Sequence, residues 1–511
     1  MAQLTGSPQP VALGEGYQLR APGIRGTADM SRPRPAGERS RSRAPEDGSQ
    51  VLDDALAGAG MTEVRRIELR LQPTPPADAT RSLRSVDGQE VLELQVPDLG
   101  PDSGQLVLAC DETGVLTWHL PVDAQKAIET PASRGAGGAK RFLIPATQPK
   151  PPAGDTGTNR SLLGTIGRKL LKVLVYPITD PVIGAIGEFF AERWEVKKRP
   201  YGLRTFTPEN RRTPGAGALA PGDWERLGSG RALLFVHGTF STAHGAFDLL
   251  SDDTFATLYE HYQQRVFAFD HFTLSHDPRR NVAWLLEQVP AGRSLELDIV
   301  CHSRGGLVSR MLAERPSAFG LDNSRVRVRR IVFVAVPNQG TLLAQPDHMV
   351  QMIDRLTTAL NLFPSGPVAE TLEVLLTAIK VIGHGVLKGL DGLASMRPDG
   401  EFLGRFNAGT REPPAADGGY YAAAADYEPT HEGLKALVAG RIADAVIDRV
   451  FEHTANDLVV PEPGVYSAID GNRGFPVEAG RLLRIPADVG VIHTTVFGYL
   501  PLGPKLLEWL V

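Results

Sequence analysis

The sequence predicts an α/β fold for its C-terminal part, with a mostly parallel sheet covered by helices on both faces, and a small β domain before it. From about residue 231 onward, short apolar runs such as 232–236 and 295–300 alternate with segments of helical periodicity. These runs are almost continuously apolar, which is typical of parallel strands buried on both faces. Before residue 122, apolar runs are separated only by turn residues, which favours a purely β structure there.

The elements of the C-terminal part follow from these runs in chain order. Strands are expected at 232–236, 266–269, 295–300, 331–336, 420–425 and 481–485, with helices over 281–289 and 305–314. Between about residues 341 and 395 the alternation is interrupted by two apolar helical stripes. We interpret this segment as a helical lid insertion over the sheet edge, with an insertion that only packs on the core as the alternative.

Composition divides the chain into five parts. Residues 1–60 are basic and rich in Pro, Gly and Ser, so a disordered tail is expected. The small β domain covers 62–122, with runs at 64–71, 92–96, 106–108 and 115–118, and a linker covers 123–160. A helical connecting segment is expected over 161–224, since leucines recur there at helical spacing, and the α/β domain fills 225–511.

Charge and cysteine content limit the class of protein and its partners. The net charge of −5 over 511 residues gives no electrostatic reason to expect nucleic acid as a partner. Only two cysteines occur, which excludes a disulfide scaffold and favours a reducing, cytoplasmic location. No secretory signal is apparent, and the apolar stretch 170–191 is too interrupted by charges and prolines to cross a bilayer. A peripheral membrane contact through the helix expected at 182–194, or through the basic tail, stays open.

The candidate nucleophile is Ser303, in the stretch Leu297-Asp-Ile-Val-Cys-His-Ser-Arg-Gly-Gly-Leu307. An apolar strand runs into this serine and a helix follows it at once, which is the pattern of a nucleophile elbow. Small residues are needed two positions before and after the serine, because the strand and helix backbones pass close together. Gly305 meets this need, while Cys301 stands where glycine is usual. We interpret Cys301 as a structural residue that ends the strand.

An oxyanion hole is expected beside this serine. The apolar run 233–236 ends in His237-Gly-Thr-Phe-Ser241, and Gly238 permits a sharp turn there. In the elbow arrangement, the loop after an early strand supplies one backbone N–H to the oxyanion, and the residue after the nucleophile supplies the other. The candidate donors are therefore Thr239 or Phe240, together with Arg304.

Asp457 and His493 are the candidate acid and base. A serine hydroxyl needs a base to take its proton, and a carboxylate fixes the tautomer of the histidine that does so. Both residues follow Ser303 in the required chain order of serine, acid and histidine. Asp426, at the end of the strand expected at 420–425, is the alternative acid.

Four blocks resemble α/β-hydrolase lipases and GPI inositol-deacylase-like esterases. They are the His-Gly-Thr-Phe segment, the elbow, Val336-Pro-Asn-Gln-Gly-Thr341 and Asn456-Asp-Leu-Val-Val-Pro461, within roughly residues 225–500. Asn338 stands where those lipases commonly carry histidine. The resemblance implies an α/β-hydrolase fold and a serine esterase of lipase-like type.

The predicted function is hydrolysis of a carboxylic ester, with acyl or lipid esters as the leading class, through an acyl-enzyme on Ser303 with His493 as base and Asp457 as acid. No cofactor is expected, and the histidine spacings match no familiar metal site. The expected partner is a small-molecule or lipid ester, while the partner of the N-terminal β domain cannot be read from its residues. Two alternatives stay open. One is a non-catalytic hydrolase-fold module that binds a partner, and the other is an acyltransferase that uses the same three residues.

Overall fold

The structure is a computed structural model, and it describes most of the chain outside a set of loops and connecting segments. The described residues are 1–33, 48–72, 85–86, 89–100, 102–111, 115–122, 138–146, 168–177, 187–314, 317–341, 344, 348–350, 353–354, 357–358, 368–383, 390–408, 419–426, 457, 459–468 and 475–511. Most of the linker expected at 123–160 lies outside them, as do residues 161–167 at the start of the helical segment expected over 161–224.

The N-terminal part consists of two antiparallel sheets packed face to face. One sheet has the order β1-β4-β5-β11-β8-β9, and the other has the order β10-β7-β3-β2, with β6 paired to β7. Their shared core contains leucine, isoleucine and valine side chains that alternate along the strands, among them Leu92, Leu94 and Val96 of β7. The elements are β1 (Ala2–Thr5), β2 (Val11–Gly14), β3 (Tyr17–Arg20), β4 (Arg25–Ser31), helix α1 (Gly48–Gly58), β5 (Thr62–Gln72), β6 (Ser85–Val86), β7 (Gln89–Pro97), β8 (Ser103–Asp111), β9 (Leu116–His119), β10 (Ala139–Pro145) and β11 (Arg168–Pro177).

The expectation of a disordered tail over residues 1–60 is wrong for the residues that the structure describes. Strands β1 to β4 occupy this region, and α1 follows. Leu4, Leu19 and Ala28 are buried in the core of the two sheets. The basic run 34–43, which dominated the composition of the segment, lies outside the described residues. The composition averaged over residues 1–60 therefore did not show the short strands, whose residues alternate between buried and exposed positions.

The helical segment expected over 161–224 is wrong at Arg168–Pro177, which forms strand β11, whereas the helix expected at 182–194 overlaps the observed helix α3 (Gly187–Lys198). This strand lies between β5 and β8 in the middle of the six-stranded sheet. Leu171 and Val173 face the core of the two N-terminal sheets, while Leu174 and Tyr176 face the core of the other part. A strand buried on both faces has no polar alternation, so its periodicity resembles that of a buried helix.

The C-terminal part confirms the expected α/β fold with a largely parallel sheet. Its strand order is β12-β14-β13-β15-β16-β17-β18, and all neighbours are parallel except the antiparallel edge strand β12. The strands are β12 (Gly202–Thr205), β13 (Arg231–Val236), β14 (Val266–Asp270), β15 (Leu295–His302), β16 (Val326–Val334), β17 (Gly419–Ala425) and β18 (Leu482–Ile485). Five of these start within two residues of the expected strands, and β16 starts earlier. The edge strand β12 was not anticipated.

Helices cover both faces of this sheet, and side chains alternate between two cores. On β13, for example, Leu234 and Val236 face one core, while Leu233 and Phe235 face the other. The helices are α3 (Gly187–Lys198), α4 (Pro221–Gly228), α5 (Ala243–Ala246), α6 (Asp252–His261), α7 (Pro278–Gln288), α8 (Gly305–Ala313), α10 (Val368–Gly383), α11 (Asp391–Ala394), α12 (Glu401–Asn407), α15 (Pro463–Tyr466) and α16 (Leu502–Leu510). Short 3-10 turns are η3 (Ser317–Phe319), η5 (Ala479–Arg481), η6 (Ala487–Val489) and η7 (Val496–Gly498).

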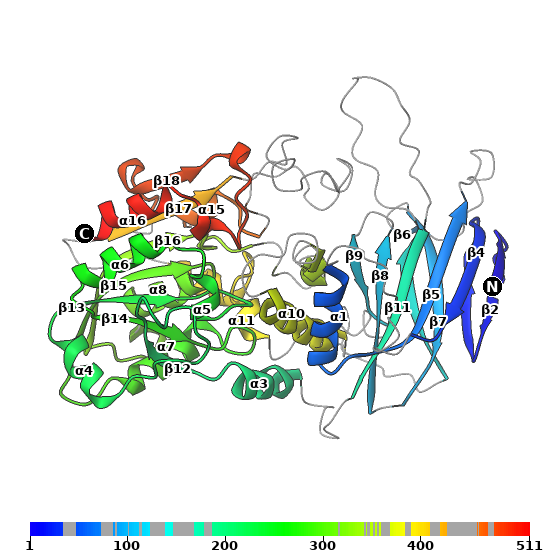
Figure 1. Cartoon of the computed structure of the whole chain (residues 1–511), viewed down its shortest axis with the longest axis horizontal. Coiled ribbons are helices and arrows are strands. Elements are labelled where there is room, and N and C mark those ends of the chain that lie inside the picture. Colours follow the sequence, from blue (N-terminus) through cyan, green and yellow to red (C-terminus); the bar gives the residue numbers. More distant parts are fainter. Residues whose placement is uncertain are drawn as a thin grey trace.

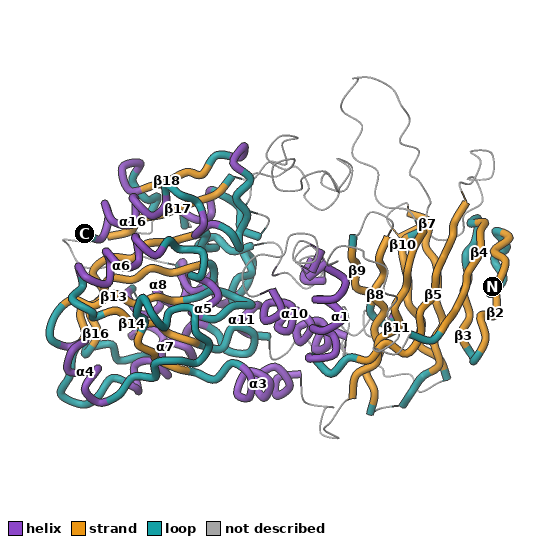
Figure 2. The backbone as a smooth tube through the Cα atoms, in the orientation of Figure 1, coloured by secondary structure: helices purple, strands orange, loops and turns teal. Residues whose placement is uncertain are grey.

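The two parts are joined by helices α1 and α10, which lie between the antiparallel sheets and the α/β part (Figures 1 and 2). Helix α10 packs on α1, α3 and β8. One hydrophobic core runs through this region, from Leu106 and Trp118 of the N-terminal sheet to Leu375 and Ile379 of α10. We call the packing of α10 on α1 and β8 the inter-domain contact.

Helix α10, which lies within the insertion at about 341–395, therefore packs on the N-terminal part through α1 and β8. Trp118 and Leu116 of β9 also bond to this segment: the Trp118 N–H donates to Asp354 over 2.7 Å, and the Leu116 N–H donates to the Thr358 hydroxyl over 3.0 Å. Much of the segment lies outside the described residues, so a lid over Ser303 stays a prediction.

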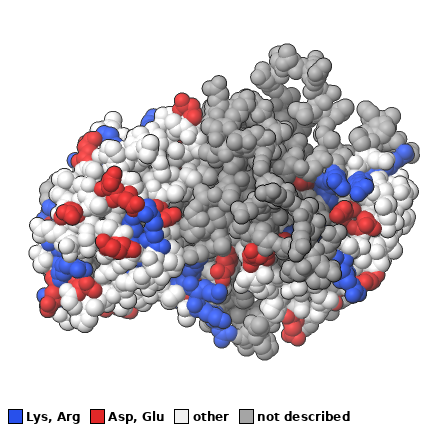
Figure 3. Space-filling model, viewed as in Figure 1, with Lys and Arg blue, Asp and Glu red and all other residues white. Residues whose placement is uncertain are grey.

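The surface shows basic and acidic side chains interspersed over the described parts of the face drawn in Figure 3. Among the described residues, the helices are too short or too polar for a bilayer span.

Candidate active site

Ser303 lies on the sharp turn that the sequence predicts between β15 and α8. Its φ of 52° is in the left-handed region, which costs a residue with a side chain about 1–3 kcal/mol. The turn is fixed on both sides: the Ser303 N–H donates to the Val334 carbonyl of β16, and its own carbonyl accepts from Gly306. The serine is buried, with 3% of its surface exposed. The backbone thus holds the hydroxyl at the carboxyl edge of the sheet.

The glycines after the serine are required by close backbone approach. A Cβ on Gly305 would lie 2.4 Å from the carbonyl oxygens of both Val236 and His237, at the end of β13. A Cβ on Gly306 would lie 2.2 Å from the Val336 side chain. Any larger residue at either position must push α8 away from the strand ends, as the sequence pattern implies.

The loop after β13 packs directly against the serine. A Cβ on Gly238 would lie 2.5 Å from Ser303 Cβ and 3.1 Å from Ser303 Oγ. Phe240 in this loop also has a left-handed backbone, with φ of 60°. Among the described residues, no acceptor takes a hydrogen bond from the backbone N–H of Thr239, Phe240 or Arg304. These three candidate donors therefore remain available beside the serine.

His493 and Asp457 are hydrogen-bonded to each other, as their chain order predicts. His493 Nδ1 lies 2.8 Å from Asp457 Oδ2, and the His493 N–H donates to the Asp457 carbonyl over 2.9 Å. The other carboxylate oxygen accepts from the N–H groups of Val459 and Val460. Because a carboxylate only accepts, Nδ1 carries the proton, and in the neutral form of the ring this leaves the lone pair on Nε2. Asp426, the alternative acid, does not pair with this histidine, and its Oδ1 has no hydrogen-bond partner among the described residues.

The Asp457–His493 pair reaches the elbow through His302, the residue before the candidate nucleophile. The rings of His302 and His493 are 4.8 Å apart between centroids, and His302 Nε2 lies 3.0 Å from the His493 carbonyl. Within the described residues, no hydrogen bond joins the Ser303 hydroxyl to the His493 ring. Such bonds are often long without substrate and tighten when it binds.

Arg304, expected only as a backbone donor, also anchors the elbow through its side chain. The guanidinium is fully buried and donates to the carbonyls of Phe272, His276 and Gly392, and to the side chains of Asn281 and Ser395. Burial lowers the pKa of Arg304 to about 10, so it stays charged at neutral pH. The elbow is thereby tied to the 272–276 loop and to α11. Nothing in the sequence pattern identified these partners.

His237 fixes the loop that carries two of the candidate donors. Its Nε2 accepts from the His271 N–H over 3.2 Å, so the proton is on Nδ1, which donates to the Gly238 carbonyl over 2.9 Å. Burial lowers the pKa of His237 to about 4, which keeps the ring neutral and this tautomer in place at neutral pH. The Gly238 carbonyl points toward the ring, and the N–H of Thr239 in the same trans peptide points the opposite way.

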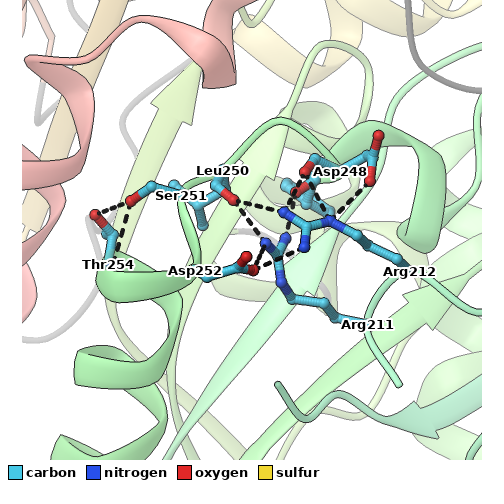
Figure 4. A network of polar contacts seen from close by, with 8 residues as sticks. Arg211, Arg212, Asp248, Leu250, Ser251, Asp252 and Thr254 are labelled. Carbon is cyan, nitrogen blue, oxygen red and sulfur yellow. Dashed lines mark hydrogen bonds and ion pairs between the residues drawn. The ribbon is translucent and has the colours of Figure 1, made fainter. Parts of the chain in front are cut away.

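The segment between α5 and α6 is held by an arginine pair that sequence reasoning missed (Figure 4). Arg211 is buried and donates to the Phe247 and Leu250 carbonyls and to Asp252, over 2.5 to 3.0 Å. Arg212 pairs with Asp248 over 2.9 Å and with Asp252 over 2.7 Å. These contacts fix the segment 247–252 at the start of α6.

Two residues that depart from the resembled blocks are structural. Cys301 is fully buried, and burial raises the pKa of its thiol, which disfavours a thiolate nucleophile. Asn338 is buried as well: its Oδ1 accepts from Arg310, and its Nδ2 donates to the Val465 carbonyl over 2.6 Å. Among the described residues, no group of three His, Cys, Asp or Glu side chains is placed to hold a metal ion.

A family model described as "Domain of unknown function (DUF7379)" matches residues 198–511. The match covers more than half of the 511 residues, so the chain belongs to this family. It begins at the end of α3 and includes the whole parallel sheet with the site residues. No curated protein matches the sequence.

Two solved structures illustrate the structural likeness. Lipase 1 from Pelosinus fermentans is 14% identical, with 54% of this chain and 98% of that chain covered and a TM-score of 0.32. The enol-lactonase from Burkholderia xenovorans LB400 is 10% identical, with 61% of this chain and 95% of that chain covered and a TM-score of 0.30. The order and direction of the strands in the seven-stranded sheet define the α/β fold of this chain.

Proposed function

We propose that this member of the DUF7379 family is a serine hydrolase that cleaves carboxylic esters through an acyl-enzyme on Ser303. The observation that carries the proposal is the hydrogen-bonded Asp457–His493 pair, which lies beside an elbow whose serine has a left-handed backbone. A strained elbow is maintained only where the surrounding structure enforces it, and such strain is concentrated at functional sites.

In the proposed reaction, Ser303 Oγ attacks the ester carbonyl carbon while His493 Nε2 takes the hydroxyl proton. Asp457 keeps the proton on Nδ1 and stabilises the imidazolium that forms. The C–O bond to the alcohol then breaks, and His493 gives its proton to the leaving alcohol. Water next attacks the acyl-enzyme with His493 as base, which releases the carboxylic acid and returns the proton to Ser303.

The negative oxygen of each tetrahedral intermediate is stabilised by the Arg304 N–H and by the N–H of Thr239 or Phe240. These groups have no acceptor among the described residues, so they need not break an existing bond to do so. One such donor is typically worth about 3–4 kcal/mol of transition-state stabilisation. No cofactor or metal takes part in the proposed reaction.

The proposed substrate class is an acyl or lipid ester. Two features support it: the apolar sequence of the insertion at about 341–395, and the resemblance of four blocks to lipases and GPI inositol-deacylase-like esterases. A lid in this insertion and a peripheral contact with a membrane surface belong to the same proposal. Acyl transfer to an acceptor other than water uses the same residues, and analysis of the products distinguishes it from hydrolysis.

A non-catalytic binding module is the second candidate, and one observation favours it. The Ser303 hydroxyl does not bond to His493 in the described structure. A fluorophosphonate probe, which modifies only an activated serine, separates the two candidates.

The test compares the wild type with Ser303→Ala and with Ser309→Ala as a matched control. Ser309 is a buried serine of α8 whose hydroxyl donates to the Gly305 carbonyl over 2.8 Å. We expect labelling of the wild type and Ser309→Ala and none of Ser303→Ala. An unlabelled wild type, or labelling that persists in Ser303→Ala, would contradict the proposal. Hydrolysis of p-nitrophenyl esters of increasing acyl length then tests the substrate class.

A further inference from the structure

His302 makes a contact that the proposed reaction does not use. It is the last residue of β15, directly before Ser303, and its Nε2 lies 3.0 Å from the backbone carbonyl of His493. The two rings are 4.8 Å apart between centroids, and the Phe497 ring meets the His302 ring edge-on at 5.7 Å. The side chain therefore spans from the strand of the nucleophile to the loop of the base.

The direction of this hydrogen bond follows from the partner. A carbonyl oxygen only accepts, so His302 Nε2 carries a proton and donates it. The other nitrogen, Nδ1, is buried with no hydrogen-bond partner among the described residues, as expected for the lone pair of a neutral ring in a largely apolar setting. Burial holds the pKa of His302 well below its ordinary value, and the neighbouring His493 acts in the same direction.

The loop that carries His493 has little regular structure of its own. It connects the 3-10 turns η6 and η7, and His493 belongs to neither. Two hydrogen bonds hold the backbone groups of His493 itself: its N–H donates to Asp457, and its carbonyl accepts from His302. One bond thus fixes the base relative to the acid, and the other fixes it relative to the strand that ends in the nucleophile.

We propose that His302 is a positioning residue that sets the distance between the His493 ring and the Ser303 hydroxyl by holding the His493 backbone. This inference rests on the proposed function. His302 and Ser303 are consecutive residues. Any shift of the loop that carries His493 relative to the end of β15 therefore changes the distance between the His493 ring and the Ser303 hydroxyl. A misplacement of about 1 Å in such a relay can cost roughly 100-fold in rate.

The decisive comparison is between His302→Gln and His302→Asn. Both replacements are uncharged amides with an N–H donor. The glutamine amide can reach the position of Nε2, whereas the shorter asparagine amide corresponds to Nδ1 and cannot reach the His493 carbonyl. We expect His302→Gln to keep kcat for p-nitrophenyl butyrate within about 5-fold of the wild type, and His302→Asn to lower it by about 10- to 100-fold. KM should change little in either variant, since neither residue is expected to contact the substrate.

The rate of labelling by a fluorophosphonate probe should fall in the same order, because it depends on the base that activates Ser303. Thermal unfolding of both variants checks folding. A purely structural role predicts that loss of activity follows loss of thermal stability and that the two amides behave alike, and either result would overturn the inference. If the wild type itself is not labelled at Ser303, the proposed function fails first. If it is labelled and both variants react at the wild-type rate, only the role of His302 is refuted.

Discussion

At the scale of single residues, Asp457 does more than orient an imidazole ring. Its carboxylate accepts from His493 Nδ1 and from two backbone N–H groups, and its carbonyl accepts from the His493 N–H. The two backbone donors belong to Val459 and Val460 and fold the loop around the carboxylate. The acid therefore fixes the tautomer of the base and its backbone at the same time.

Asp457→Asn should lower kcat by about 10²–10⁴-fold with little change in KM. An asparagine amide presents a donor toward Nδ1 and favours the tautomer with the proton on Nε2, which cannot act as the base. The remaining amide oxygen can still accept from the Val459 and Val460 N–H groups, so the loop should keep its fold. The measurement is ester hydrolysis together with thermal unfolding.

The matched control is Asp426→Asn, at the end of β17. Asp426 is the acid that the sequence left as an alternative, and in the structure it does not pair with His493. We expect its substitution to change kcat by less than about 3-fold, because it breaks no bond to the base. A large loss in this variant, with Asp457→Asn unaffected, would reverse the assignment of the acid.

At the scale of elements, the elbow depends on the close approach of the first residue of α8 to the end of β13. Gly305→Ala places a Cβ 2.4 Å from two backbone carbonyl oxygens, which cannot rotate away as a side chain would. Either α8 moves or the loop from Gly238 to Phe240 is displaced. We expect a loss of stability of about 1–3 kcal/mol and a fall in kcat that exceeds what unfolding explains.

Gly404→Ala serves as the control for that substitution. Gly404 lies in α12, and a Cβ there would meet no atom within 4 Å. Alanine is a better helix former than glycine by up to about 1 kcal/mol, so this variant should be as stable as the wild type or more stable, with unchanged activity. Equal activity of Gly305→Ala and the wild type would show that the approach of α8 to β13 is not needed for the site.

The elements that the sequence could predict are those whose pattern has one interpretation. Strands β13, β14 and β15 are apolar runs followed by helical segments, and the parallel sheet follows from that alternation. Strand β11 has the same continuous apolar character because one face packs on the other N-terminal sheet and the other face on the core that contains α10, so its leucines also fit a helix. The antiparallel edge strand β12, Gly202–Thr205, is too short to show a period.

The site divides in the same way. Ser303, Asp457 and His493 could be found because motif and chain order restrict them to a few positions. The partners of the Arg304 guanidinium come from segments as far as 91 residues away, as for Ser395, and no local pattern relates them. The hydrogen bond between His302 and the His493 carbonyl joins residues 191 positions apart and uses a backbone acceptor, which every residue type has. The sequence therefore could not predict it.

At the scale of the whole molecule, the two parts share a core rather than meeting at a polar boundary. Leu106 and Tyr176 of the N-terminal sheet belong to the same apolar cluster as α10 and the parallel sheet. The Tyr176 hydroxyl donates to the Lys380 carbonyl over 3.0 Å, and the Lys380 ammonium donates to the Ala59 carbonyl over 2.5 Å. Helix α10 is thus fixed at its C-terminal end by groups from the N-terminal part.

The buried Lys380 ammonium allows the inter-domain contact to be tested by measuring the free energy of unfolding as a function of pH. Burial lowers the pKa of Lys380 to about 8 in the folded protein, against an ordinary value near 10.5. Between these values the unfolded chain binds more protons than the folded one, so the stability contributed by this group rises with pH. The free energy of unfolding of the wild type minus that of Lys380→Met should therefore rise by about 1–2 kcal/mol from pH 8 to pH 9.5.

Urea unfolding of both proteins at several values between pH 8 and pH 9.5 measures this difference, and the other titrating groups cancel because the two chains share them. Lys198→Met is the control: its ammonium is partly exposed and pairs with Glu373 of α10 over 3.1 Å, beside the inter-domain contact. The free energy of unfolding of the wild type minus that of Lys198→Met should vary little over the same pH range, since an exposed ion pair contributes at most about 1 kcal/mol. If the difference in free energy of unfolding between the wild type and Lys380→Met does not change with pH, water reaches the Lys380 ammonium. Helix α10 then does not pack on α1 and β8 in solution. Helix α10 belongs to the insertion at about 341–395, whose last residues, Gly392 and Ser395, accept from the Arg304 guanidinium. A steep profile would therefore show that this insertion is packed against the N-terminal part at Lys380 in solution.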